Sequence, residues 1–380
     1  MPSNVAEKLI EDYTGMVILD LTLAARLYSE FESEGNSLLL MQSLFHAQQA
    51  AEKAFKLFTV VTNLKKLEEL KELGHRPLLN TFDSLIKDAK KAITEHSNSS
   101  ELGPVEKLKI KDKIECFEKW IKNIKDKIKE TSCYKRVKKV LELQLSLSSD
   151  LDECLEKLSK LLGELSKRSP EVVEYVYARL VLLKAAVQFA RSVVEKTPGL
   201  GDSVQRGEPL TYDQLKEIID GVKSVLSKWE LVHKNILENP PAELDQVRKS
   251  LPVDRQQRFM ETLREVCEDP RKMLQLFTVE EQFPGKIAKA INLLTAPIAL
   301  GDLPLPNGKP LLDHVVCLDV FSECGRYVEA GDSETTPELL AKKRDVARLL
   351  VLAVELWTIH FLGTCTMIGA VRKEVERRAA

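Results

Sequence analysis

Residues 37–62 read SLLLMQSLFHAQQAAEKAFKLFTVVT, and this stretch decides the fold class. Apolar and small side chains recur at every third or fourth position, which is the period of one face of an α-helix. They are Leu40, Leu44, Ala47, Ala51, Ala54 and Phe58. Ser37 is a residue type that caps helix N-termini, and Gly35-Asn36 ends the preceding segment. The stretch therefore predicts a long helix whose alanine-rich stripe allows a second helix to approach closely.

Most of the chain on either side repeats this helical pattern. Glycine (16) and proline (16) make up 32 of the 380 residues, about 8% against roughly 12% in an average chain. This composition excludes collagen and most all-β folds, and it predicts an all-α protein. The other expected helices cover residues 5–31, 80–94, 169–196, 211–238, 252–267, 270–277, 285–294, 311–327 and 337–377.

Two heptad seams follow one another in the first half of the chain. The first consists of Ile110, Ile114, Phe117, Ile121, Ile124 and Ile128, and the second of Leu147, Leu151, Cys154, Leu158, Leu161 and Leu165. Such spacing is typical of a coiled coil, so we expect a long antiparallel coiled-coil hairpin. The alternative is a pair of ordinary amphipathic helices in a globular core. The expected domains are residues 1–103, the hairpin 104–168, a returning helix 169–200, and a C-terminal helical region 201–380.

The charge balance and the short motifs exclude several functions. Lys and Arg (56) nearly cancel Asp and Glu (58), leaving a formal charge of −2, which excludes a strongly basic nucleic-acid coat. The stretch 301–309 ends in Gly-Lys, but its glycine spacing and the following Pro310 do not fit a phosphate-binding P-loop. No zinc-protease, dinucleotide or nucleophile-elbow motif occurs. We expect no metal and no cofactor.

The cysteine pattern and the N-terminus predict the compartment. The seven cysteines are Cys116, Cys133, Cys154, Cys267, Cys317, Cys324 and Cys365. Their number is odd and they are scattered without a CxxC pair, so we expect reduced, mostly buried thiols. The acidic residues Glu7, Glu11 and Asp12 stand where a signal peptide has a basic flank. A cytoplasmic location follows as the expectation.

One apolar segment, residues 349–371, is long enough to cross a bilayer. It reads LLVLAVELWTIHFLGTCTMIGAV, close to the ~20 residues that a membrane helix needs. Glu355 and His360 lie inside it, and a carboxylate within a membrane is costly. We expect a buried core helix in which these two residues act as polar packing partners, with a membrane span as the alternative.

Residues 43–57 carry the polar side chains best suited to chemistry. His46, Gln49 and Lys53 share one helical face, which makes that face a candidate contact surface. The alternative is a tight helix–helix contact with Lys53 and Lys56 in solvent, and periodicity alone favours it. His75 and Arg76 follow in a turn.

A second candidate site lies in the C-terminal third. Asp319 and Glu323 are spaced one helical turn apart, and Arg326 and Tyr327 close the same predicted helix. Arg326 and Tyr327 at a helix end suit contact with a phosphate or a base. The alternative is that Arg326 neutralises Glu323 and the C-terminal carbonyls.

The stretch 37–93 resembles the first conserved helix and following turn of the HEPN domain (higher eukaryotes and prokaryotes nucleotide-binding). The matching residues are Phe45, Ala47, Gln48, Ala50, Ala51, Glu52, Lys53, Ala54, Lys56, Gly74 and His75. The layout of the chain is similar to abortive-infection proteins of that superfamily. The resemblance implies an up-and-down bundle, frequent homodimers, and either RNA cleavage without metal or non-catalytic binding.

The nuclease branch of that superfamily is marked by Arg-x4–6-His late in the bundle, and none of the six histidines here has such an arginine. Our leading hypothesis is therefore a non-catalytic module of a defence or toxin–antitoxin system. It would act through contact with a protein partner or a second copy, and through binding of RNA or a nucleotide, without membrane contact. The expected binding residues are His46, Gln49, Lys53, His75, Arg326 and Tyr327.

Two other hypotheses remain open. One is a divergent metal-independent ribonuclease that uses His46 or His75 together with Lys53 or Arg76, because cleavage needs a proton carrier and a cation for the developing charge. The other is an oligomeric scaffold in which the coiled-coil hairpin is the functional part.

Overall fold

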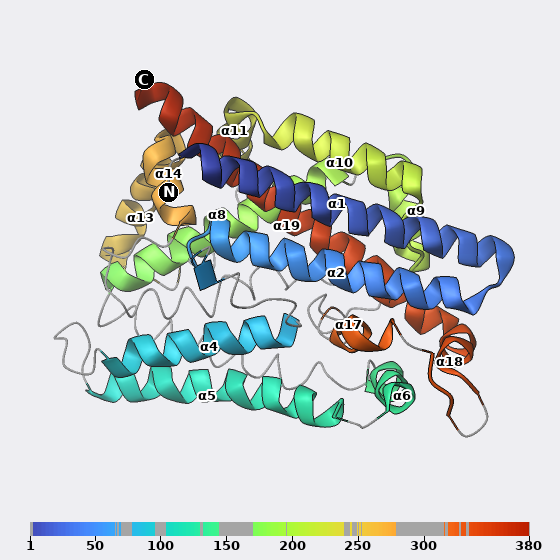
Figure 1. The fold of residues 1–380 in the computed structure, drawn as a ribbon. Helices are drawn as coiled ribbons and strands as arrows, with labels where there is room; N and C mark the ends of the chain where they lie inside the picture. The colour runs from blue at the N-terminus through green and yellow to red at the C-terminus, as the bar shows by residue number, and fades with distance from the viewer. Residues whose placement is uncertain are drawn as a thin grey trace.

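A computed structural model describes residues 3–64, 78–95, 104–129, 132–143, 170–194, 196–238, 253–278, 318–326, 328–331 and 334–379, with a few single residues between them. All regular elements in these ranges are helices, apart from one isolated bridge between Ala330 and Thr335. The predicted all-α class is thus confirmed (Figure 1). The elements are α1 (Ser3–Glu34), α2 (Ser37–Val61), α4 (Leu78–Glu95), α5 (Pro104–Lys127), α6 (Cys133–Leu143), α8 (Pro170–Val194), α9 (Leu200–Arg206), α10 (Tyr212–Leu226), α11 (Trp229–Glu238), α13 (Val253–Glu268), α14 (Pro270–Phe277), η1 (Leu318–Val320), α17 (Phe321–Cys324), α18 (Thr336–Lys342) and α19 (Arg344–Ala379).

Helices α1 and α2 form an antiparallel hairpin and lie side by side along their length (Figure 1). The alanine-rich stripe of α2 faces the interior, and Ala47 and Ala51 are fully buried. The turn uses Gly35 in the left-handed region (φ 69°). Asn36, rather than Ser37, caps α2, since its side chain accepts a hydrogen bond from the Leu38 N–H at 3.1 Å.

Helix α19 is the core of the bundle and packs against α2, α8, α10 and α14. Its Trp357 and Phe361 contact aromatic rings of α2 at tilted and edge-to-face angles, and the Phe58 and Phe361 ring centres lie 4.9 Å apart. By length and composition α19 is able to cross a membrane, but 78% of its most apolar window is buried inside the bundle. This burial supports the predicted core helix rather than the membrane span.

Two predicted helices are interrupted. The Thr211–Gln214 capping box opens α10 as predicted, but α10 ends at Leu226 and α11 starts at Trp229 instead of one helix running to residue 238. The last helix breaks at Lys343, because α18 packs against α2 and α6 while α19 turns into the core. Of the helix expected over 311–327, Val315 is helical, and residues 318–324 form η1 and the single turn α17.

Four residues of the first heptad seam are buried, and α5 packs against α4 (Figure 1). Ile114, Phe117, Ile121 and Ile124 are each at most 2% exposed. This contact agrees with the alternative of an ordinary amphipathic helix in a core. Residues 147–165, which carry the second seam, lie outside the described residues, so the hairpin, the domain boundaries and the scaffold hypothesis stay predictions.

The expectation of reduced cysteines is wrong for part of the chain. Cys133 in α6 and Cys324 in α17 form a disulfide across 191 residues, and Cys116 is also disulfide-bonded. The two Cα atoms lie 5.2 Å apart because α6 packs on α17. This closeness arises from tertiary packing, so the spacing of cysteines along the sequence did not reveal the pair. Cys267 and Cys365 are free and buried, as predicted. Disulfides are typical of oxidising compartments, so they count against the cytoplasmic location, which stays a prediction.

The remaining two cysteines, Cys154 and Cys317, lie outside the described residues.

Candidate functional site

A polar cluster lies on the surface where α1 and α2 meet. The Asp20 carboxylate accepts a hydrogen bond from His46 Nδ1 at 3.1 Å and pairs with the Lys53 ammonium through its other oxygen. The side chains of His46 and Lys53 are about a quarter exposed, 24% and 25%. Sequence reasoning identified His46 and Lys53 but missed Asp20. The available signal was that Asp20 is the one charged residue in the apolar stretch 16–25.

The electrostatics of the cluster follow from the position of Asp20. Partial burial raises the pKa of this carboxyl, but the hydrogen bonds and charges of His46 and Lys53 outweigh burial and hold the pKa below its usual value. Asp20 is therefore ionised at neutral pH and neutralises Lys53. Nδ1 of His46 is hydrogen-bonded to Asp20. Its Nε2 is therefore the ring nitrogen that can bind an outside ligand.

Gln49 was predicted to share this exposed face, and that prediction is wrong. Its side chain is buried and donates to Gln48 Oε1 at 2.6 Å. Gln48 in turn donates to Glu52 at 3.1 Å, and Glu52 forms a buried ion pair with Lys56. Lys56 was expected in solvent under one interpretation but is 4% exposed. Several residues that carry the HEPN resemblance are thus part of a buried network.

Asp319, from the far end of the chain, is a second buried polar group. Its two oxygens accept hydrogen bonds from the Leu78 and Leu79 N–H groups at 2.7 and 2.5 Å, which caps the N-terminus of α4. Burial raises its pKa to about 7, against the lowering effect of those two bonds. Gln48 of α2 also lowers this pKa, while the charge of Glu52 raises it. Asp319 therefore has a structural position and is not part of an exposed carboxylate pair with Glu323.

The Phe45 ring lies between Arg326 and His46 of the polar cluster. Its guanidinium carbon is 5.2 Å from the centre of the Phe45 ring, which in turn lies 5.2 Å from the His46 ring. Glu323 pairs with Arg136 at 2.7 Å rather than with Arg326, so that part of the alternative is wrong, while the interaction of Arg326 with the C-terminal carbonyls stays a prediction.

The other site residues named from sequence, His75, Arg76 and Tyr327, lie outside the described residues.

Glu355 and His360 are buried polar partners in α19, as predicted. Glu355 Oε2 accepts from the Leu210 N–H at 2.7 Å and fixes the segment before α10. Burial raises the Glu355 pKa to about 8. His360 Nδ1 bonds to the Leu356 carbonyl of its own helix. Both contacts serve packing.

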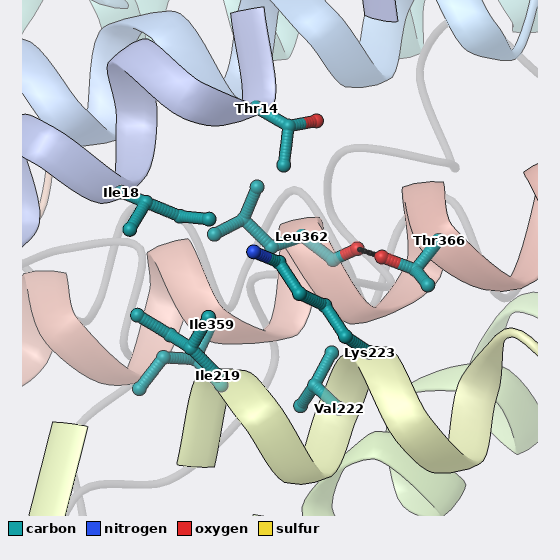
Figure 2. Close-up of a pocket in the computed structure, with 8 residues that line it drawn as sticks. All are labelled: Thr14, Ile18, Ile219, Val222, Lys223, Ile359, Leu362 and Thr366. Atoms are coloured by element: carbon teal, nitrogen blue, oxygen red, sulfur yellow. Dashed lines mark hydrogen bonds between the residues drawn. The ribbon is translucent and has the colours of Figure 1, made fainter. Parts of the chain in front are cut away.

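Figure 2 shows a small hollow between α1, α10 and α19. Thr14, Ile18, Ile219, Val222, Lys223, Ile359, Leu362 and Thr366 line it. The Thr366 hydroxyl donates a hydrogen bond to the Leu362 carbonyl at 2.8 Å (Figure 2). The lining is mainly apolar, and it lies on the side of α1 that faces α10, away from the cluster of Asp20, His46 and Lys53.

The cluster offers one imidazole, one ammonium group and one carboxylate. Together they can exchange hydrogen bonds with a polar partner surface or a phosphate. Within the described ranges, no group of three His, Cys, Asp or Glu side chains lies close enough to hold a metal ion.

No protein-family model, curated protein or solved structure matches this chain.

Proposed function

We propose that this chain is a non-catalytic helical module of a defence or toxin–antitoxin system, acting through contact with another protein and through binding of RNA or a nucleotide. The setting comes from the resemblance of residues 37–93 to the HEPN domain. The contact surface is the cluster of Asp20, His46 and Lys53.

One observation carries the non-catalytic part of the proposal: Asp20 binds both His46 and Lys53. Cleavage of RNA by a histidine needs a cation directed at the developing charge of the phosphate. Lys53 is the nearest cation in this cluster, and its charge is already matched by Asp20. A surface whose ammonium charge is already matched suits binding of a ligand through hydrogen bonds better than stabilisation of the charge that develops on a phosphate during cleavage.

The interior network supports the same proposal. Gln48, Glu52 and Lys56, which match the HEPN helix, are buried and bond to one another along α2. Their bonds lie inside the protein, which leaves the partly exposed His46 and Lys53 as the groups that meet a ligand.

The test is RNA cleavage by the purified protein in the presence of EDTA, with total RNA and tRNA. We expect intact RNA with the wild type and with His46→Ala. A His233→Ala variant is the matched control, since His233 is a half-buried helix histidine stacked on Trp229, remote in sequence from the cluster.

A divergent metal-independent ribonuclease is the second candidate, and the Asp20–His46 hydrogen bond is the observation that favours it. A carboxylate that orients an imidazole is the usual partner of a general acid–base histidine. Cleavage by the wild type and by His233→Ala, lost in His46→Ala, would establish this candidate and overturn the non-catalytic proposal.

A further inference from the structure

Helix α8 carries a positive charge into the interior of the bundle. The charge belongs to Arg179, and α8 packs against α10, α11, α14 and α19 (Figure 1). The Arg179 side chain is 1% exposed and is among the largest fully buried side chains in the described part of the chain. Val176, Leu182 and Leu183, three or four positions away on the same helical face, are also fully buried. The guanidinium group therefore lies on an apolar face of α8.

The Arg179 guanidinium group lacks a hydrogen-bond partner within the described ranges. Its Nε, Nη1 and Nη2 atoms are all buried, and none of them donates to an acceptor there. Other buried charged groups in these ranges do have partners, since Glu52 pairs with Lys56 and Glu355 accepts a backbone N–H. Burial of a charge without a partner is costly, because the interior replaces little of the hydration that the charge loses. An anion that binds the guanidinium group would offset this cost.

Arg179 keeps its charge at neutral pH. Burial lowers the pKa of the guanidinium group to about 10, while Tyr175, one turn earlier on α8, acts in the opposite direction. A pKa of about 10 is still well above neutral pH, so the group stays cationic. Within the described part of the chain, no carboxylate and no second cation contributes to this pKa. The group thus presents a single positive charge to a ligand.

The chemistry of this group selects the class of ligand. A guanidinium group is a planar fork of N–H donors that forms two parallel hydrogen bonds with a carboxylate. One carboxylate matches one positive charge, whereas a phosphate group carries close to two charges at neutral pH and would leave one unmatched in the interior. A side chain that is 1% exposed lies beyond the reach of a macromolecular surface, so the ligand is a small molecule. The buried neighbours Val176 and Leu182 favour a ligand with an apolar body.

We propose that Arg179 binds a small monocarboxylic acid with an apolar body in the interior of the bundle. The acid enters by local opening of the packing around α8, and its carboxylate accepts two hydrogen bonds from the guanidinium group. Arg179 lies outside both the Asp20 cluster and the stretch 37–93. The inference therefore does not depend on the proposed function.

The test is urea unfolding of the full chain at pH 7 and constant ionic strength, in chloride buffer with hexanoate, benzoate or inorganic phosphate added. An acid that binds the folded chain with a Kd of about 1 mM lowers the unfolding equilibrium constant about tenfold at roughly 10 mM. We expect this fall for the wild type with hexanoate or benzoate, and no fall for Arg179→Met. Without added acid, Arg179→Met should be more stable than the wild type, because it removes an unpaired buried charge.

Arg206→Met is the matched control, since Arg206 is an exposed arginine of α9 that pairs with Glu208, and it should respond to the acids as the wild type does. The uncharged hexanamide and benzamide should have no effect on the wild type. Arg179→Lys keeps the positive charge without the planar fork and should bind the acids more weakly.

The proposal is overturned if neither acid stabilises the wild type, or if the amides act as well as the acids. It is equally overturned if Arg179→Met or Arg179→Lys responds to the acids as the wild type does, or if only phosphate stabilises the wild type. Circular dichroism confirms that each variant is folded.

Discussion

Replacing Glu355 by glutamine should remove a large pH dependence from the stability of the bundle. The Glu355 side chain is fully buried in α19, and Oε2 accepts a hydrogen bond from the Leu210 N–H at 2.7 Å. Oε1 is buried without a hydrogen-bond partner in the described part of the chain. Burial raises the pKa to about 8, although the Leu210 bond lowers it in part. The folded protein therefore keeps this carboxyl protonated at neutral pH.

The sign of the effect follows from proton binding. In the unfolded chain the carboxyl titrates near 4.5, so between pH 4.5 and 8 the folded state holds a proton that the unfolded state has released. Stability is full below pH 4.5 and falls as the pH rises through about 8. At 1.36 kcal/mol per pH unit, the loss between pH 5 and pH 8 is roughly 4 kcal/mol.

The assay is urea unfolding of the wild type and of Glu355→Gln at pH 5, 6, 7 and 8. Glutamine keeps an oxygen for the Leu210 N–H but does not titrate, so the variant should gain roughly 4 kcal/mol of unfolding free energy relative to the wild type over this range. Any constant packing cost cancels, because only the change with pH is compared. Glu376→Gln, an exposed position in the same helix, is the control and should follow the wild type. Parallel pH profiles for the wild type and Glu355→Gln would refute the reasoning.

Two further predictions concern contacts between distant segments. Asp319→Ala should lower the free energy of unfolding by about 1–3 kcal/mol, because two buried N–H groups at the start of α4 lose their acceptor; urea unfolding measures this, and an unchanged midpoint would contradict the capping role. Cys133→Ala and Cys324→Ala should each lower stability by up to about 5 kcal/mol through loss of the same crosslink. The double variant should be close to either single one, whereas additive losses would argue against the disulfide.

Much of the helical framework was predictable because its causes are local. The Thr211–Gln214 capping box, the proline at the start of α14 and the glycine after α1 each act within a few residues. The interruptions were not predictable, since the break at Lys343 arises where α18 and α19 pack against different helices.

The candidate site was predictable only in part. His46 and Lys53 lie on one face of α2, so the spacing identified them together. Gln49, on the edge of that face, turns inward to Gln48 because the interior supplies a hydrogen-bond partner. Asp20, which orients both site residues, comes from a different helix and has no spacing relation to them.

The amino-acid sequence by itself determined the all-α class, the positions of most helices, and which side of each helix is apolar. It did so because hydrogen bonding, capping and side-chain periodicity act over one or two helical turns. Tertiary structure alone decided what each face and each polar group meets. The cap of α4 by Asp319, the Cys133–Cys324 disulfide and the Leu210–Glu355 bond join residues more than a hundred positions apart. These contacts depend on which buried surfaces pack together, and no spacing along the chain encodes that choice.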